Sequence, residues 1–309
     1  MSPYESLIED LRNDRVIVID GATGTELERR GAEMHDRAWS AQATLTSPEL
    51  LRGVHEDYIR AGARVIIANT FSTNRIMLEP AGLADRFEEL NRAAVRIARE
   101  ARDRSGAAER VVVAGSLSHQ VPVLGGADRR DTSAVPAPEI AAERFAEMAR
   151  LLADAGAEMI MLEMMSDPAL ANPAIDAARA VGLPFWVGFS MRADAGGRPV
   201  SYALPELPAA EMFRAIDVDG ADAAGIMHSN ATITGAAIEE LRATWSGPIF
   251  AYPDSGYFKM PHWQFENIIP PAELVEHART WVASGARVLG GCCGLGVEHV
   301  EALAREWPS

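Results

Sequence analysis

Ala155-Gly156-Ala157-Glu158 leads directly into the apolar run Met159-Ile160-Met161-Leu162-Glu163. A similar four-residue turn, with glycine in second place, precedes three other apolar or β-branched runs, at residues 61–64, 219–222 and 284–287. Glycine is typical of the position just after a helix, where the backbone needs a positive φ. The four turns therefore predict helices that end immediately before strands.

Strand candidates alternate with helical patterns along the whole chain. The strand candidates are residues 16–20, 65–69, 111–116, 159–163, 185–189, 224–227, 249–252 and 287–290, and the amphipathic stretches include 48–61, 83–102, 139–153 and 272–283. Such alternation predicts parallel strands and an α/β fold. Eight units favour a closed (β/α)8 TIM barrel over an open sheet. We expect residues 1–309 to form a single barrel of this kind.

The segments that leave the strands are longer and more irregular than those that enter them. The longest are residues 30–46, 117–138, 191–205 and 253–271. A barrel gathers these segments at the C-terminal ends of its strands, the face on which barrel enzymes carry their active sites. The sequence thus predicts a large pocket walled by loops on that face.

Bulk properties exclude several classes of protein. Hydrophobic residues make up 48% of the 309, enough for a large core, and the net charge of −15 argues against nucleic acid and anionic membranes as partners. Residues 1–13 carry three acidic residues and no long apolar run, so we expect no secretory signal. No apolar stretch approaches the roughly 20 residues that span a bilayer. Two cysteines exclude a disulfide framework, and we expect a soluble, cytoplasmic protein.

Both cysteines stand together in Gly290-Gly291-Cys292-Cys293-Gly294, at the end of the eighth predicted strand. A disulfide between neighbours is strained, whereas two thiolates are good ligands for Zn²⁺, at about 2.3 Å each. The spaced cysteine pairs of a structural zinc site are absent. We therefore predict a catalytic zinc held by Cys292 and Cys293; inert packing and a redox role are the alternatives.

A catalytic zinc usually takes three protein ligands and keeps one position open. The chain has no third cysteine, and the best candidate is His228, which ends the sixth predicted strand. His119, after the third strand, is the reserve candidate. The remaining histidines lie in helical patterns or in long loops, at positions 35, 55, 262, 277 and 299.

Two carboxylates end predicted strands and so face the same mouth of the barrel. Asp20 begins the turn Asp20-Gly21-Ala22-Thr23-Gly24-Thr25, in which Gly21 allows a ligand to approach the backbone closely, and Glu163 ends the fourth strand. A tight turn in which Thr25 or Asp20 caps the helix is the alternative for the first motif, and a solvated or capping acid explains the second equally well. A phosphate cradle is disfavoured because Asp20 repels anions and no glycine-rich nucleotide motif is present. Together the two carboxylates suit the ammonium group of an amino acid.

These segments together resemble the zinc-dependent homocysteine S-methyltransferase family. The matching segments are Asp20-Gly21-Ala22-Thr23-Gly24-Thr25, Asn69-Thr70-Phe71, Gly115-Ser116, Leu162-Glu163, Tyr252-Pro253-Asp254-Ser255-Gly256, Gly290-Gly291-Cys292-Cys293-Gly294 and Glu298-His299. They run in family order from about residue 15 to about residue 300 and cover nearly the whole chain. The glycine-flanked cysteine pair and the opening Asp-Gly-Ala are the specific matches; the others are weak singly.

The resemblance implies roles for individual residues. Cys292 and Cys293 match the zinc ligands of the family, and Asp20 and Glu163 match the carboxylates that hold the ammonium group of homocysteine. Tyr252 and Ser255 belong to a turn that matches a wall of the substrate pocket, and Gly21 belongs to the matching first turn.

Three positions depart from the family pattern. The family usually supplies a third cysteine ligand after the sixth strand, where this chain has His228. Asp254 stands where asparagine is common, and Ser118-His119 replaces a proline-containing turn.

The implied activity is transfer of a methyl group to a zinc-activated thiol, most simply homocysteine, which gives methionine. The donor is a sulfonium or ammonium compound such as S-methylmethionine, S-adenosylmethionine or a betaine. Other interpretations are a zinc-dependent barrel lyase or hydrolase that activates water, a non-catalytic zinc- or thiol-binding regulatory protein, and a subunit that serves a separate corrinoid protein. The sequence defines neither the donor, the acceptor thiol nor the oligomeric state.

Overall fold

Eight parallel strands form the centre of the computed structural model, which describes residues 1–122, 131–259 and 264–308. The strands are β1 (Ile17–Val18), β2 (Val65–Ile67), β3 (Val112–Ser118), β4 (Met159–Met165), β5 (Phe185–Phe189), β8 (Ala223–Asn230), β9 (Ile249–Asp254) and β12 (Ala286–Leu289). Each coincides with one of the eight strands predicted from the sequence, within a few residues at the ends. All eight strands of the barrel were thus predicted correctly from the sequence.

The sheet closes on itself. Hydrogen bonds connect the strands in the order β1-β12-β9-β8-β5-β4-β3-β2. The two outer strands of this order also meet, because the Asp20 N–H donates to the Val65 carbonyl (3.0 Å) and the Arg64 N–H donates to the Val18 carbonyl (2.8 Å). The structure is therefore the predicted TIM-like α/β barrel.

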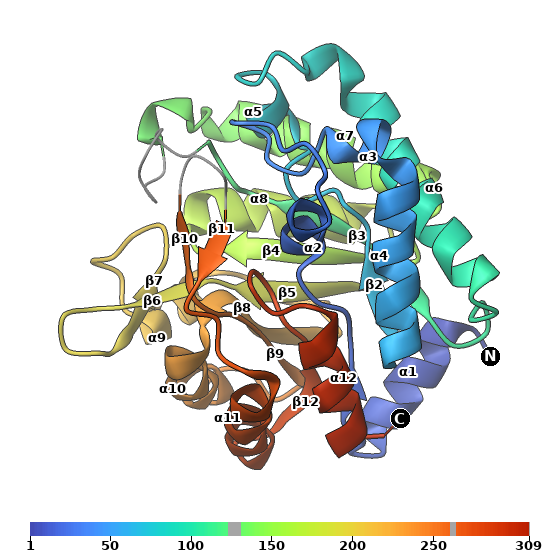
Figure 1. Cartoon of the computed structure of the whole chain (residues 1–309). Helices are drawn as coiled ribbons and strands as arrows, with labels where there is room; N and C mark the ends of the chain where they lie inside the picture. The colour runs from blue at the N-terminus through green and yellow to red at the C-terminus, as the bar shows by residue number, and fades with distance from the viewer. Residues whose placement is uncertain (123–130, 260–263, 309) are drawn as a thin grey trace.

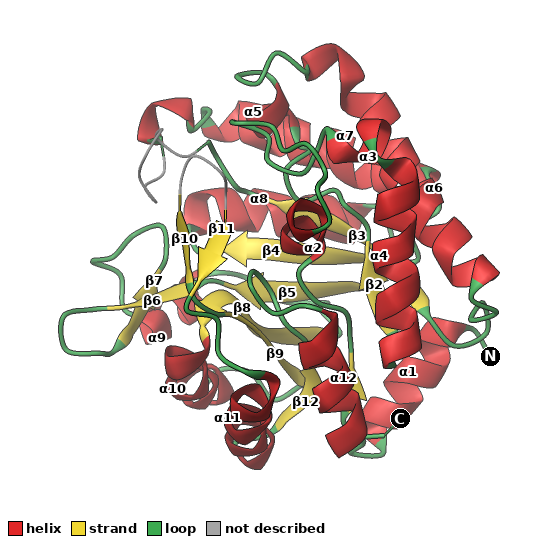
Figure 2. Cartoon of the chain, in the orientation of Figure 1, coloured by secondary structure: helices red, strands yellow, loops and turns green. Residues whose placement is uncertain are grey.

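Helices surround the barrel (Figures 1 and 2). They are α1 (Pro3–Arg12), α2 (Thr23–Arg29), α3 (Ala43–Thr46), α4 (Pro48–Ala61), α5 (Arg75–Leu78), α6 (Phe87–Arg104), α7 (Pro138–Asp154), α8 (Pro168–Ala180), α9 (Ala209–Ala215), α10 (Ala231–Arg242), α11 (Pro271–Ala283) and α12 (Val297–Glu306), with short 3-10 turns at Ala84–Arg86 and Thr132–Ala134. The four predicted amphipathic stretches correspond to α4, α6, α7 and α11. The glycines of the four repeated turns all adopt positive φ, between 79° and 112°, as predicted.

The apolar core has two layers. One lies between the strands and the surrounding helices, and the other fills the inside of the barrel with residues such as Ile17, Met159, Trp186 and Phe250. Leu7 of helix α1 is fully buried in this inner layer. Helix α1 therefore closes the N-terminal end of the barrel, opposite the end toward which the strand arrows point (Figure 2).

Replacing Leu7 with alanine should lower the free energy of unfolding by about 2–5 kcal/mol, because it opens a cavity that the rigid barrel cannot fill. Urea denaturation followed by circular dichroism measures this change. Ile140 on α7 is the control, since its side chain is 45% exposed and its replacement by alanine should cost well below 1 kcal/mol. Equal losses for both variants would contradict the role of α1 as a plug.

Two of the long segments after strands contain hairpins. Strands β6 (Met191–Ala193) and β7 (Pro199–Ser201) pair antiparallel, and so do β10 (Tyr257–Lys259) and β11 (Gln264–Glu266). The prediction that these segments are irregular was wrong at these places, since three-residue strands are too short to show alternation. Both hairpins lie at the C-terminal end of the barrel strands (Figure 2), where they add walls to that end.

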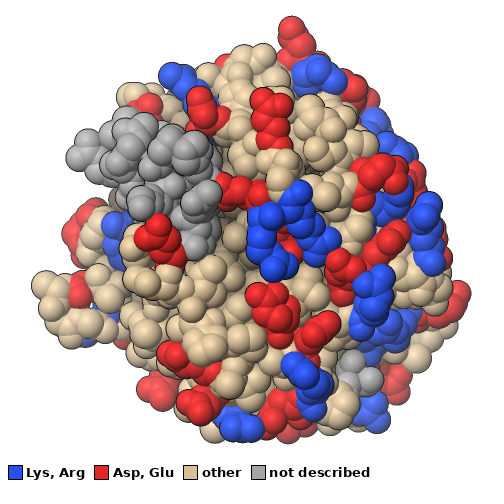
Figure 3. All heavy atoms as spheres, viewed as in Figure 1, with Lys and Arg blue, Asp and Glu red and all other residues tan. Residues whose placement is uncertain are grey.

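The molecular surface carries charges of both signs. Acidic and basic side chains are interspersed on the face shown in Figure 3. Among the described residues, none of the helices has the length and apolar character needed to cross a bilayer.

Candidate metal and substrate site

The loop after β12 carries both cysteines and is held by its neighbours on two sides. The Gly291 N–H donates to the carbonyl of Asp20, and the Cys292 N–H donates to the carbonyl of Pro253 (2.6 Å). A Cβ atom at Gly290 would lie 2.6 Å from the Tyr252 ring and 2.8 Å from the Asp20 carbonyl oxygen. Glycine is therefore required for the loop to pass so close to its neighbours, and the loop fixes both thiols at the barrel mouth.

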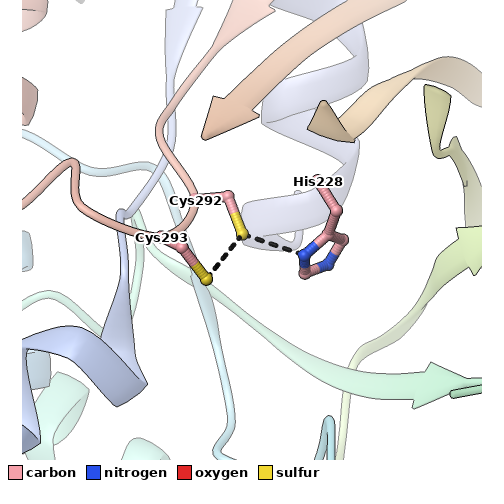
Figure 4. Close-up of side chains that lie close together, drawn as sticks. All are labelled: His228, Cys292 and Cys293. Atoms are coloured by element: carbon pink, nitrogen blue, oxygen red, sulfur yellow. Dashed lines mark hydrogen bonds between the residues drawn. The ribbon is translucent and has the colours of Figure 1, made fainter. Parts of the chain in front are cut away.

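Cys292, Cys293 and His228 bring their side chains together, as Figure 4 shows. One ligand atom from each residue lies within 4.8 Å of the others. The two Sγ atoms are 3.7 Å apart, and the Cys292 Sγ is 3.0 Å from the His228 Nδ1. In tetrahedral zinc, two sulfurs at about 2.3 Å from the metal lie roughly 3.8 Å apart. The spacing of the thiols and the chemistry of the donors therefore fit such an ion.

The other nitrogen of His228 faces Glu163. Its Nε2 lies 2.7 Å from the Glu163 Oε2, and the carboxylate is almost fully buried. The His228 ring also stacks on Phe71, with centroids 4.9 Å apart and planes at 30°. These two contacts fix the imidazole plane and direct Nδ1 toward the thiols. Sequence reasoning missed both, because β4, β8 and the segment after β2 are far apart along the chain.

Burial and mutual contacts shift the pKa values of the cluster. Burial raises the pKa of Cys292 well above its ordinary value. The Cys292 thiol, together with His228, lowers the pKa of Cys293 to about 6 against the effect of burial. Burial lowers the pKa of His228, but Cys293 and Glu163 favour the imidazolium and raise that pKa to about 9. Without a metal, the cluster thus favours a thiolate beside an imidazolium.

Strained backbone gathers at this site. Five non-glycine residues in the described part of the chain have positive φ, and three of them, Trp39, Met164 and His228, line the cavity next to the thiols. Such conformations cost of order 1–3 kcal/mol each and persist where the surroundings enforce them. Met164 follows Glu163 directly, at an irregularity within β4 where the register with β5 shifts. Positive φ therefore occurs at His228 itself and at the residue next to Glu163.

Two cavities meet at the cluster. We call the larger one, of about 710 Å³, the outer chamber, and the smaller one, of about 50 Å³, the inner chamber. His228, Cys293, Trp39 and Phe71 line both. The ligand atoms therefore lie where the chambers join, so a group bound in either one reaches them.

Three predicted substrate residues lie around the inner chamber. Gly21, Tyr252 and Glu163 line it. Asp20 is fully buried behind this wall, where it accepts hydrogen bonds from the Ile67 N–H (2.6 Å) and the Tyr252 hydroxyl (3.1 Å). Burial raises the pKa of Asp20 well above its ordinary value. In this geometry Asp20 orients Tyr252, and its direct contact with an ammonium group stays a prediction.

Ser255 supports the cysteine loop. Its N–H donates to the Cys293 carbonyl (3.0 Å), and its hydroxyl accepts the Ile269 N–H (2.9 Å). The side chain is buried and is absent from the described walls of both chambers. Its predicted contact with substrate therefore stays a prediction, while its contact with the loop is direct.

The reserve ligand His119 lies outside the cluster. Its Nε2 accepts the Ser166 N–H at 3.0 Å, so it holds the turn after β4. Of the other histidines, three lie in helices α4, α11 and α12, His35 bonds the turn at Arg37, and position 262 lies outside the described residues. Among described residues, His228 is thus the histidine that joins the two cysteines.

Comparison with known proteins agrees with this arrangement. A family model described as homocysteine S-methyltransferase matches residues 17–307. The chain belongs to the homocysteine S-methyltransferase family. It is 29% identical to homocysteine S-methyltransferase YbgG of Bacillus subtilis, over 98% of this chain and 97% of that one. It is 30% identical to the homocysteine S-methyltransferase of Escherichia coli, over 98% of this chain and 99% of that one.

A solved structure in this family is also similar in fold. The metallated form of the homocysteine methyltransferase MmuM of Escherichia coli superposes with a TM-score of 0.77 at 25% identity, covering 99% of this chain and all of that one. Because the chain belongs to this family, it is a methyltransferase. Because a relative of the same fold binds metal, the cluster of Cys292, Cys293 and His228 is a metal site to be tested.

Proposed function

We propose that this protein transfers a methyl group from a sulfonium or ammonium donor to a thiol bound at Zn²⁺, with homocysteine as the first acceptor to test. The observation that carries the proposal is the cluster of two thiols and one imidazole at the junction of two chambers. Cys292, Cys293 and His228 would hold the metal, a donor set known from catalytic zinc sites. Bound zinc would lower the pKa of the acceptor thiol, so that a nucleophilic thiolate would be present at neutral pH.

The residues around the cluster orient the reactants. Glu163 accepts the His228 Nε2–H and so keeps Nδ1 directed at the thiols. Phe71 and Trp39, whose rings meet edge to face at 6.2 Å, form apolar walls of the junction. The acceptor reaches the junction beside Tyr252 and Glu163, and the donor approaches from the outer chamber. Alignment of the two where the chambers join lowers the entropic cost of transfer.

The reaction needs no general acid or base. The acceptor sulfur forms a bond to the methyl carbon, while the bond from that carbon to the positive sulfur or nitrogen of the donor breaks. The donor leaves as a neutral thioether or amine, and no proton moves in this step. The buried acids at the mouth are therefore available for positioning, as the hydrogen bonds of Asp20 and Glu163 indicate.

The proposal is tested with a matrix of acceptors and deuterated-methyl donors. Acceptors are homocysteine and selenocysteine, the latter because a relative is named selenocysteine Se-methyltransferase; donors are S-methylmethionine, S-adenosylmethionine and glycine betaine. We expect mass spectrometry to find label on an acceptor, loss of transfer after dialysis against a chelator, and recovery with Zn²⁺. No labelled product from any pair, with zinc bound, would refute the proposal.

A further inference from the structure

The outer chamber contains an arginine for which the described protein supplies no acceptor. Arg192, on strand β6, lines the chamber together with His228 and Cys293. Its Nε atom is buried without a hydrogen-bond partner. No ion pair or hydrogen bond of its guanidinium appears among the described residues. A buried cationic donor left unpaired is unfavourable, and such groups often await a ligand.

The two arginines of the β6–β7 hairpin have different partners. Arg198 is largely exposed and pairs with Asp194, with Nε 2.9 Å from Oδ2. Arg192 instead lies over the Tyr202 ring, 4.4 Å from its centroid. A guanidinium that contacts an aromatic ring through its face keeps its in-plane N–H groups available for a planar partner. A carboxylate is the ligand that matches this geometry, because it accepts two parallel hydrogen bonds.

Arg192 is also tied to the reacting end of the chamber. The N–H of its neighbour Met191 donates to the Ser229 hydroxyl at 2.8 Å, and Ser229 follows His228 directly. The base of the hairpin is therefore fixed beside the metal cluster. A molecule held at Arg192 extends from there toward the cluster within one cavity.

The charges that line the outer chamber are few and of opposite sign. Besides His228, the ionisable side chains among its described lining are the Arg192 guanidinium, the Asp254 carboxylate and the groups of Tyr202, Tyr257 and Cys293. Asp254 ends β9 opposite Asn230, next to the strand that carries His228. A cationic side chain and an anionic one in a single chamber suit a zwitterion, whose onium group favours Asp254 and the aromatic faces of Trp39 and Phe71.

We infer that Arg192 forms a carboxylate-binding subsite in the outer chamber and restricts the methyl donor to onium compounds that carry a carboxylate. This inference rests on the proposed function for the identity of the ligand as donor. The carboxylate is held at the hairpin, and the onium methyl group is thereby placed toward the thiols. A cationic donor without a carboxylate leaves Arg192 unpaired and binds weakly.

The test measures binding without turnover. Calorimetry on the zinc-loaded protein, with no thiol present, compares S-methylmethionine with its carboxamide and glycine betaine with its carboxamide. We expect at least one carboxylate to bind about 10- to 100-fold more tightly than its amide, the range for a charged hydrogen bond. Arg192→Gln should remove this preference, Arg192→Lys should keep part of it, and the matched control Arg198→Gln should leave it intact.

The outcomes separate this inference from the proposed function. Equal binding of acid and amide, no measurable binding of either pair, or a preference that survives Arg192→Gln would overturn the subsite. Methyl transfer that shows no carboxylate preference would leave the proposed function standing and remove only the subsite. If the carboxylate preference depends on Arg192 but the protein transfers no methyl group, the subsite stands and the proposed function is refuted.

Discussion

Replacing either Cys292 or Cys293 with alanine is expected to abolish stoichiometric metal binding while the barrel still folds. Each variant removes one of two thiolates whose 3.7 Å spacing suits a shared ion. The remaining thiol and imidazole form an incomplete set, and metal binding by such sites falls steeply with each lost ligand. Elemental analysis of the purified variants measures zinc, and methyl transfer should fall by at least about 1,000-fold, a barrier increase of roughly 4 kcal/mol.

The fold should survive because backbone atoms hold the loop. The N–H of residue 292 still donates to the Pro253 carbonyl, and the carbonyl of residue 293 still accepts from Ser255. Ile233→Ala is the control, since Ile233 lines the outer chamber and offers no ligand atom; it should keep full zinc content. Full zinc content in both cysteine variants would rule out the assigned site.

The barrel could be predicted from the sequence because its signals are local and repeated. Each strand is a short apolar run, and four of the preceding turns place glycine where the structure has positive φ, as at Gly62 and Gly285. The hairpins β6–β7 and β10–β11 could not be predicted in the same way. Their strands have three residues each, so their pairing depends on the barrel mouth beneath them rather than on any periodicity.

The site was predictable only in part, for a related reason. Cys292 and Cys293 could be recognised in the sequence because glycines flank them. These glycines are visible as a local motif, and the structure explains one of them, since the loop passes too close to Tyr252 and Asp20 for a side chain at Gly290. The contact between Glu163 and His228 joins residues 65 positions apart. It also depends on the left-handed backbone conformation of Met164 and His228. Neither residue type predicts that conformation from the local sequence.

The role of Arg192 also could not be predicted from the sequence. In the sequence it is one of two arginines in a polar loop, at positions 192 and 198. The hairpin separates them, since it presents one to the chamber and pairs the other with Asp194. Their different roles follow from the strand pairing, which is invisible before the fold is known.

Glu163→Gln is expected to weaken zinc binding by about 10- to 100-fold, because Glu163 contacts the ligand His228. Loss of a carboxylate that orients a histidine ligand typically has an effect of this size. Glu163 acts here as a positioning residue, because its Oε2 lies 2.7 Å from Nε2 while Nδ1 faces Cys292. Competition with a chromogenic chelator measures the affinity without any assay of activity. Asp20→Asn is the control, because Asp20 is a second buried carboxyl at the mouth whose side chain accepts hydrogen bonds from Ile67 and Tyr252.

A double-mutant cycle decides whether Glu163 acts through the imidazole. His228→Cys should retain zinc, since three thiolates form a sound ligand set, but a cysteine side chain has no second donor to offer Glu163. Glu163→Gln should therefore cost nothing in zinc affinity in that background, although it costs about 10-fold or more in the wild type. The same loss in both backgrounds would mean that Glu163 acts on the metal through its charge alone. The two losses therefore distinguish hydrogen bonding to His228 from the general field of a buried acid, because only the hydrogen bond requires the imidazole.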